Sequence, residues 1–236
     1  MHTETKPVAF AAVLEDKAAA IKAIAELNNQ GQPLSDAGVG NLRFFTQKID
    51  GKDIILATMD LDQTRLSSET EDAWNTITHS PTLKDKFLAL EKSISPHQRH
   101  ADAKTKSPWV LTETVCEIRP NNAAKAKADS PWFSAVTQLK NEKEADYRLL
   151  HNNVWPGVID AIGASNISRF DIFLIEFGDN QPHLFYLFQY TGDNFEEDMA
   201  AQPNSPVNQR WWKFTDACQT PLPEATKGPW LDMDLL

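Results

Sequence analysis

Alternating and periodic apolar positions divide the first half of the chain into short strands and helices. The two strand-like runs 43–49 and 53–57 flank Asp50-Gly51, a pair typical of a tight hairpin turn. Helical spacing of apolar residues marks 17–27 as an amphipathic helix. In order, the predicted elements are a strand at 8–14, a helix at 17–27, strands at 43–49 and 53–57, helices at about 70–78 and 82–93, and a strand at about 110–118.

The second half shows the same order of elements. Asn194, with Glu197 three positions later, is a helix N-cap pattern, and Ser205-Pro206 starts another helix. The order is β-α-β-β-α-β, that of a ferredoxin-like unit. The predicted elements are a strand at 133–139, a helix at 142–163, strands at 167–177 and 184–190 joined by a loop at 178–182, helices after Asn194 and Ser205, and a strand at 230–235.

Short motifs recur in one order and indicate two degenerate copies of one unit. Ser107-Pro108-Trp109-Val110 returns as Gly228-Pro229-Trp230-Leu231, each before a short alternating segment. We predict a first unit at 5–119, a linker at 120–130 and a second unit at 131–236. Since one such unit leaves a sheet face uncovered, we predict an α+β fold in which the two units pack sheet to sheet as a pseudo-dimeric αβ barrel.

Composition narrows the class of protein. The 236 residues carry 23 Lys and Arg against 33 Asp and Glu, a net charge of −10, which argues against a nucleic-acid partner. No apolar run approaches the roughly 20 residues that span a bilayer, and the first residues do not read as a signal peptide. We therefore expect a cytoplasmic protein with no membrane association.

Cysteines and isolated histidines are assigned structural or surface roles. Cys116 and Cys218 are far apart, and we interpret them as two buried free thiols of a reducing compartment. His97 and His100 lie in a polar, charged run, and His183 lies at the start of a predicted edge strand. We expect all three histidines at the surface, and the spacing of Cys and His offers no metal site.

Two aromatic clusters in the second half are the candidates for chemistry. On one continuous helix, Tyr147, His151 and Trp155 fall on a narrow stripe, because four residues advance only 40°. Trp211 and Trp212 point about 100° apart on a helix, so that one could belong to the core and the other could line a cavity. Indole faces beside an imidazole and a phenol suit a sugar. From spacing alone, a helix face packed on a sheet is the more common explanation of such a stripe.

The second half resembles the L-rhamnose mutarotase family, whose members interconvert the α- and β-anomers of L-rhamnose. The motifs that carry the resemblance are Tyr-x3-His-x3-Trp-Pro at 147–156 and Arg-Trp-Trp at 210–212, with Gln138 on the preceding strand. The resemblance covers 131–236 and implies a ferredoxin-like unit. It implies His151 as the acid/base residue with Tyr147 beside it. The substrate contacts that it implies are Gln138, Trp155, Phe170, Trp211 and Trp212.

The chain also departs from the family pattern. Phe170 stands where the family usually has a substrate-contacting Tyr, so one hydroxyl is missing or is supplied elsewhere. The first copy lacks the catalytic set, because Ile21, Ala25 and Asn29 fall at the positions of Tyr147, His151 and Trp155. We expect a degenerate first lobe and one working site in a covalent pseudo-dimer.

The resemblance leads to one functional hypothesis and leaves two alternatives open. An imidazole with a pKa near 6.5 can give and take the proton that anomer exchange requires, and no cofactor or metal is needed. The expected partner is a monosaccharide, L-rhamnose or a related 6-deoxyhexose. The alternatives are an αβ-barrel monooxygenase or haem-handling protein, and a sugar-binding protein without catalysis.

Overall fold

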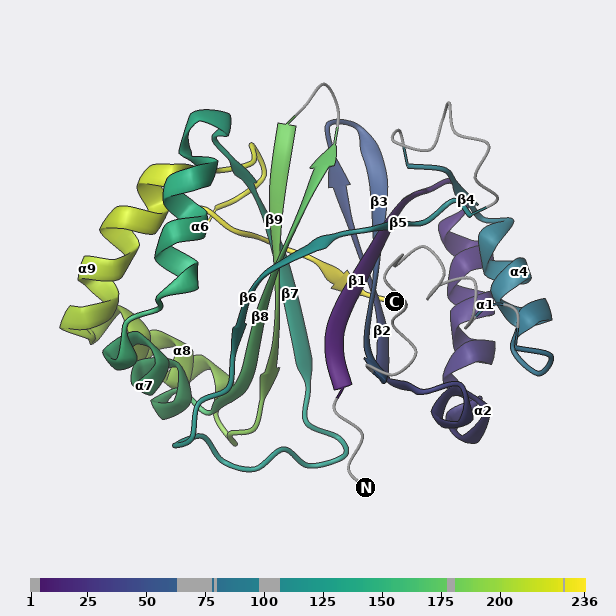
Figure 1. The fold of residues 1–236 in the computed structure, drawn as a ribbon, viewed down its shortest axis with the longest axis horizontal. Coiled ribbons are helices and arrows are strands. Elements are labelled where there is room, and N and C mark those ends of the chain that lie inside the picture. The colour runs from purple at the N-terminus through teal and green to yellow at the C-terminus, as the bar shows by residue number, and fades with distance from the viewer. Residues whose placement is uncertain (1–4, 63–77, 79, 98–106, 178–180, 227) are drawn as a thin grey trace. The chain divides into compact units, whose positions relative to one another are not determined.

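A computed structural model describes residues 5–62, 78, 80–97, 107–177, 181–226 and 228–236. The chain divides into two units, each with an antiparallel sheet and helices on one face of it (Figure 1). The first unit comprises Met1–Glu113 and Asp234–Leu236, and the second comprises Thr114–Met233. This is the predicted mixed fold, and the closure of the two sheets into a barrel remains a prediction.

The first unit is built on a sheet of order β12-β2-β3-β1-β4, with β5 also paired to β1. The hairpin β2–β3 turns through Asp50 and Gly51, whose φ angles of 48° and 79° are those that the two-residue turn requires. The helices α1, α2 and α4 cover one face (Figure 1). The elements are β1 Thr5–Leu14, α1 Lys17–Asn28, α2 Gly31–Asp36, β2 Val39–Ile49, β3 Lys52–Asp62, α4 Lys84–Glu91, β4 Ile94–Ser95, β5 Val110–Leu111 and β12 Asp234–Leu235.

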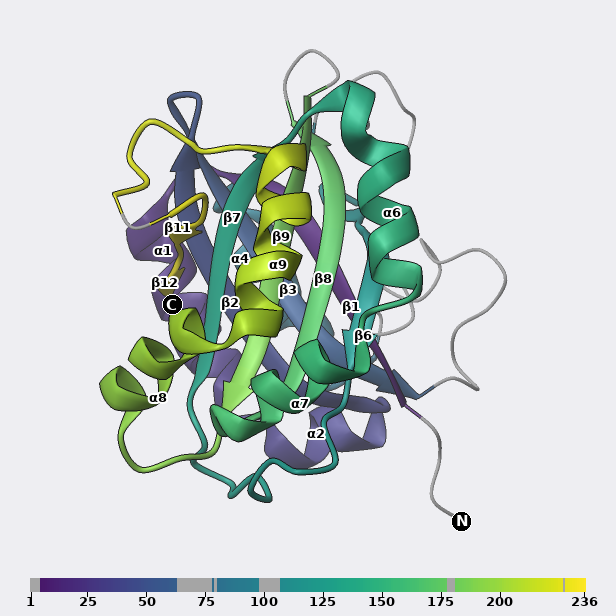
Figure 2. The ribbon, with the colours of Figure 1, turned by 90° about the vertical axis from the view of Figure 1, so that its left-hand side faces the viewer.

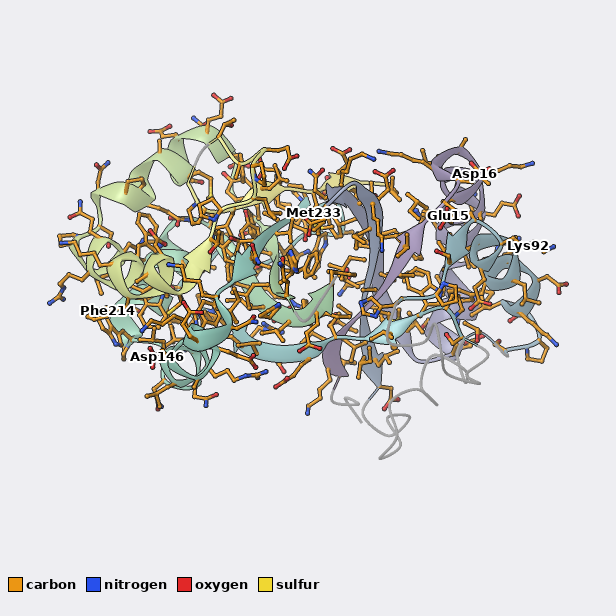
Figure 3. The ribbon with its side chains drawn as sticks, turned by 90° about the horizontal axis from the view of Figure 1, so that it is seen from above. Glu15, Asp16, Lys92, Asp146, Phe214 and Met233 are labelled. Carbon is orange, nitrogen blue, oxygen red and sulfur yellow. The ribbon has the colours of Figure 1, made fainter. Side chains whose placement is uncertain are left out.

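Backbone hydrogen bonds tie the start of α1 to the end of α4. The amides of Glu15 and Asp16 both donate to the carbonyl of Ser93, at 2.9 and 3.1 Å. Figure 3 shows Glu15 and Asp16 close to Lys92, the residue that ends α4. The Asp16 side chain also caps α1 by accepting from the Ala19 amide, so the two helices meet at a fixed point.

The second unit has a sheet of order β10-β7-β9-β8-β6, with β11 also paired to β7. The helices α6, α7 and α9 cover one face of this sheet (Figure 2). Its elements are β6 Glu113–Ile118, β7 Trp132–Leu139, α6 Glu144–Asn152, α7 Pro156–Ala164, β8 Ile167–Phe177, β9 Gln181–Tyr190, α8 Phe195–Ala201, α9 Pro206–Thr215, β10 Gln219–Thr220 and β11 Leu231–Asp232, with 3₁₀ turns at Asn141–Lys143, Gln202–Asn204 and Asp216–Cys218.

Local signals for the helix starts of the second unit are confirmed. The Asn194 side chain accepts from the Glu197 amide at 3.4 Å and donates to the Glu197 carboxylate at 2.8 Å. The Ser205 hydroxyl accepts from the Asn208 amide, and Pro206 occupies the first helical position, where a missing N–H costs nothing. These caps fix where α8 and α9 begin.

The single helix predicted at 142–163 is wrong. It is two helices, because the chain leaves α6 at Asn153 and restarts at Pro156. The residue before a proline is pushed to extended backbone, and Trp155 has φ −62° and ψ 133°. Trp155 is therefore the N-cap of α7 and does not continue the Tyr147–His151 stripe along α6.

The boundaries of the units and the last strand also differ from the prediction. Residues 114–119, expected in the first unit, belong to the second, where β6 pairs with β8. The strand predicted at 230–235 is two strands, of which β11 pairs with β7 and β12 pairs with β2 of the first unit. Both differences depend on strand pairing between segments that are distant in sequence, and a local pattern does not predict such pairing. The short elements α2 and β4 were not predicted, and the helix predicted at about 70–78 lies outside the described residues apart from Thr78.

Two histidines expected at the surface are buried. His183 lies on β9, a central strand between β7 and β8, and its side chain is fully covered. His97 is also fully covered, and its amide donates to the carbonyl of Pro108 at 3.1 Å. The prediction for His183 was wrong because it took β9 for an edge strand; His100 lies outside the described residues. Cys116 and Cys218 are buried and free, as predicted.

Candidate active site

Helix α6 brings an imidazole and a phenol together on its inner face. Tyr147 and His151 are one turn apart, only 1% and 8% exposed, and their rings stack with centroids 4.0 Å apart. On the other side of the helix, Leu149 is 67% exposed, and Arg148 pairs with Glu144 one turn earlier. The amphipathic pattern of α6 therefore turns these two polar aromatic groups inward.

The His151 ring has a defined proton arrangement. Its Nδ1 lies 2.9 Å from the backbone carbonyl oxygen of Tyr147. A carbonyl can only accept, so Nδ1 carries the hydrogen and Nε2 keeps its lone pair in the neutral ring.

Burial holds that ring neutral. Burial lowers the pKa of His151 from 6.5 to about 4, while the bond to the Tyr147 carbonyl acts in the opposite direction. The expected pKa near 6.5 is thus wrong, because desolvation disfavours the charged ring. At neutral pH the imidazole is a base.

Tyr147 keeps its proton over the same pH range. Burial raises the pKa of its phenol well above the ordinary value of 10, and the nearby Gln219 side chain offsets this only in part. The pair thus offers one proton acceptor and one hydrogen-bond donor. Such a pair is what acid/base chemistry on a neutral molecule requires.

Helix α9 contributes the tryptophan pair. The buried Trp211 lies edge-on to His151, with ring centroids 5.4 Å apart, and Trp212 is half-buried. Both indoles line the cavity described below, although their spacing left one of them open to a core role. Phe214, on the outer side of α9 in Figure 3, is 52% exposed.

Between these helices and the sheet lies a cavity of about 470 Å³ within the second unit. That volume falls in the range of about 300–1,000 Å³ typical of small-molecule sites. Tyr147, His151, Trp211 and Trp212 line its helical side. The cavity is thus walled mainly by rings and aliphatic side chains with a few polar groups between them.

Aromatic side chains of the sheet form the opposite wall. Phe170 on β8 faces Tyr186 on β9, with ring centroids 5.4 Å apart, and Phe188 stacks against Phe170. Trp230, from the segment before β11, packs against Tyr186 with centroids 4.8 Å apart. Phe170, Tyr186, Phe188 and Trp230 all line the cavity, and Tyr186 supplies a phenol close to the ring of Phe170.

Two of the predicted contacts lie outside the cavity lining. The Trp155 ring packs edge-on against Trp211, with centroids 5.3 Å apart, and against Phe214. The Gln138 amide donates to the Gln181 side chain at 2.9 Å. Because the helix breaks before Pro156, Trp155 packs against Trp211 outside the cavity lining. Gln138 bonds to Gln181 of β9 and does not line the cavity either.

Several lining residues were not found from the sequence. Tyr186 lies in a stretch that was predicted only as a strand, and Trp230 lies in a recurring motif to which no site role was given. Asn208 stands two residues before the Arg-Trp-Trp motif. Gln219 and Asp216 follow α9, and the pKa of the Asp216 carboxyl is raised by partial burial. Of these residues, Asn208 is the one whose closeness to the Arg-Trp-Trp motif could have indicated a role in the site.

Over the part of the chain that the structure describes, no group of three or more His, Cys, Asp or Glu side chains is arranged to hold a metal ion. No helix among those residues is both long and apolar enough to cross a membrane.

Comparison with known proteins identifies relatives of the second unit. Residues 133–235 match the sequence model of the L-rhamnose mutarotase family. The L-rhamnose mutarotase of Burkholderia orbicola is 33% identical over 77 residues, which are 33% of this chain and 68% of that protein. The chain belongs to the L-rhamnose mutarotase family. The predicted family is confirmed, and it places the second unit among sugar mutarotases, which are isomerases.

Other relatives extend this finding. The L-rhamnose mutarotase of Mesorhizobium japonicum is 28% identical over 80 residues, 34% of this chain and 70% of that protein. These matches cover about a third of the chain, so the mutarotase resemblance belongs to its C-terminal part.

Solved structures resemble the chain over its length. A protein assigned as a monooxygenase from Fusobacterium nucleatum superposes with a TM-score of 0.55 at 11% identity, covering 100% of this chain and 94% of that one. A second, from Lactobacillus acidophilus, gives 0.51 at 11% identity, covering 98% and 94%. At such identity the likeness shows the fold alone.

Proposed function

We propose that the second unit interconverts the α- and β-anomers of L-rhamnose or a related 6-deoxyhexose, with His151 as the acid/base group. One observation carries the proposal: a buried neutral imidazole, its Nδ1–H bonded to the Tyr147 carbonyl, lines an aromatic cavity of monosaccharide size. Membership of the mutarotase family supports the reaction class.

The proposed reaction needs one base that returns its proton. The free Nε2 of His151 takes the proton from the anomeric hydroxyl as the bond between C1 and the ring oxygen breaks. The electron pair of that bond goes to the ring oxygen, which takes the proton from the imidazolium. Both oxygens are bonded to C1, so one nitrogen can serve both. Rotation about C1–C2 and reversal of the steps give the other anomer.

The lowered pKa of His151 suits this sequence. A neutral resting ring is ready to accept, and a buried imidazolium is a strong acid that passes its proton on. Tyr147, stacked on the imidazole and protonated, would donate a hydrogen bond to the oxygen that gains charge.

The walls of the cavity suit a 6-deoxy sugar. Indoles of Trp211 and Trp212 offer faces for ring C–H groups, and the aromatic wall of the sheet offers an apolar surface for a methyl group. Tyr186, next to Phe170, would supply the hydroxyl that the family's usual Tyr provides and Phe170 lacks.

We also propose that the first unit carries no second mutarotase site. Ile21, Ala25 and Asn29, which we align with the catalytic residues, are all exposed and offer no proton acceptor of suitable pKa. The single working site would then belong to the second unit.

Saturation-transfer NMR of L-rhamnose and L-fucose anomers tests the function. We expect wild-type protein to accelerate anomer exchange and His151→Ala to reduce the acceleration by about 10²–10⁴-fold, the usual contribution of a positioned acid/base group. Leu149→Ala, on the exposed side of the same helix, is the control and should match wild type.

Three results would count against this proposal. Exchange at the buffer rate with wild-type protein and bound sugar would leave a sugar-binding protein without catalysis. A His151→Ala protein as fast as wild type would keep the enzyme and remove His151 from its chemistry. Oxygen consumption without anomer exchange would favour the monooxygenase alternative.

A further inference from the structure

Two buried amide side chains line the cavity without full hydrogen bonding. Asn208 on α9 and Gln219 on β10 are 2% and 4% exposed. The side-chain carbonyl oxygen of each is buried and has no hydrogen-bond partner among the described residues. Neither residue was assigned a role by the motifs or by the predicted catalytic set.

An unpaired buried carbonyl is costly, so it calls for an explanation. An acceptor without a donor loses its hydrogen bonds to water on burial and gains none in return. Folded proteins retain few such groups, and those that remain often serve a site. The two that line this cavity are therefore candidates for contacts that only a ligand completes.

Surrounding contacts hold both amides in place. The Asn208 Nδ2 donates to the backbone carbonyl of Gln202 at 3.3 Å, which leaves its oxygen as the end without a partner. The backbone of Gln219 is fixed by the pairing of β10 with Leu139 of β7, and its side chain is hydrogen-bonded with the Tyr147 phenol. Neither amide needs a large rearrangement to meet a ligand.

The positions of the amides fit a small polyhydroxy ring. Asn208 lies three and four residues before Trp211 and Trp212, on the same face of α9. Gln219 lies at the other end of that helix, beside the Tyr147–His151 pair. A ring stacked on the indoles would have edges towards both amides.

We propose that Asn208 and Gln219 accept hydrogen bonds from two ring hydroxyls of the sugar and determine which sugars bind. The inference rests on the proposed function, since it takes the occupant to be the sugar. A site with buried acceptors discriminates strongly against an analogue that lacks the matching hydroxyl, because the acceptor is then left unpaired. The aromatic walls bind any sugar of similar shape, so these two acceptors supply the selectivity.

Calorimetric titration with L-rhamnose and its 2-, 3- and 4-deoxy analogues tests the proposal. We expect wild-type protein to bind at least one monodeoxy sugar about tenfold or more weakly than L-rhamnose. Gln219→Met should weaken binding of L-rhamnose by about tenfold and abolish the penalty for one deoxy sugar. Asn208→Leu should do the same for another deoxy sugar.

Controls and alternative variants keep the test decisive. Gln32→Met and Asn28→Leu make the same changes on exposed helix positions of the first unit and should bind all four sugars as wild type does. If either cavity variant fails to fold, Gln219→Ala or Asn208→Ala replaces it with the same expectation. Because an unpaired acceptor is removed, we expect the free variants to melt no more than a few degrees below wild type.

The measurements distinguish failure of the amide proposal from failure of the proposed function. Wild-type protein that binds all three deoxy sugars as well as L-rhamnose would overturn the amide assignment, as would variants that keep the wild-type ratios. Anomer exchange measured in the same samples reports on the function by itself. Selective binding without exchange would retain the amide contacts and remove the mutarotase activity.

Discussion

At the scale of the residue, burial decides the charge of His151, and this gives activity a defined pH dependence. Its pKa is lowered to about 4, so the active neutral ring persists as the pH falls until that value is approached. We expect the protein-dependent rate of anomer exchange to be level between about pH 5.5 and 8 and to fall below pH 5. A midpoint near 6.5, seen by NMR across this range, would mean that the ring is solvated.

The same burial makes stability depend on pH. The unfolded chain protonates His151 below about pH 6.5, whereas the folded chain does so only near pH 4, so the unfolded state binds more protons between these values. The free energy of unfolding therefore falls as pH is lowered through this window. Urea unfolding should show that wild type loses about 2–3 kcal/mol of this free energy between pH 7 and 4.5. His151→Gln should not show this loss. A parallel loss in the variant would assign it to other groups.

Phe170 stands where the family usually has a Tyr, and the neighbouring Tyr186 allows a direct test of which side chain supplies the missing hydroxyl. If the Tyr186 phenol takes over the missing contact, Tyr186→Phe should weaken L-rhamnose binding by about 5–30-fold, the worth of one to two kcal/mol. Phe170→Tyr added to that variant should restore part of the affinity, since the two rings face each other at 5.4 Å. Tyr190→Phe, which loses a bond to Asp198 away from the cavity lining, is the control for a general loss of stability.

At the scale of the element, the sequence predicts individual helices, turns and caps better than the connections between them. The caps Asn194 and Ser205 and the Asp50-Gly51 turn act within a few residues, so their side chains could be recognised directly. Tyr147 and His151 share one face of α6 for the same local reason. Trp155 was misplaced because helical periodicity was carried through Pro156, whose effect on the preceding residue outweighs it.

The break before α7 changes the role expected of Trp155. Its ring supports Trp211 and Phe214 from behind and does not line the cavity. Two edge-on aromatic contacts are worth about 1–3 kcal/mol beyond the buried area of the rings, so Trp155→Ala should lower the free energy of unfolding by at least that amount. Trp155→Phe should recover most of it. We expect sugar titration to show a smaller loss of affinity for Trp155→Ala than for Trp212→Ala; a larger loss would make Trp155 a direct contact.

At the scale of the whole molecule, no local sequence pattern predicts which of the two sheets β6 and β12 join. Residues 114–118 join the sheet of the second unit, and the last strand, β12, joins that of the first. Alternation predicts that these segments are strands, but their partners lie up to about 190 residues away in sequence. Asn208 and Gln219 could not be predicted either, because their burial and the unpaired state of their side-chain oxygens are properties of the folded cavity.

The segment that carries Trp230 is hydrogen-bonded to the sheet of the second unit. Trp230 lines the cavity, and β11 follows it directly and pairs with Val136 and Ala135 of β7. The Met233 amide then donates to the Ser134 carbonyl at 2.9 Å. A chain held at that end loses less entropy when Trp230 packs on Tyr186. The pairing of β11 with β7 therefore stabilises a wall of the cavity.

Deletion of residues 234–236, which belong to the first unit, tests whether β11 is sufficient to hold Trp230. The truncated protein should bind L-rhamnose as the full chain does, because the pairing of β11 with β7 remains and Tyr147 and His151 keep their own contacts on α6. Asp234→Asn removes only the exposed ion pair with Lys17, worth at most about 1 kcal/mol, and should bind as wild type does. A calorimetric titration in which the truncated protein binds tenfold or more weakly than the full chain would show that β11 alone does not hold Trp230 in place.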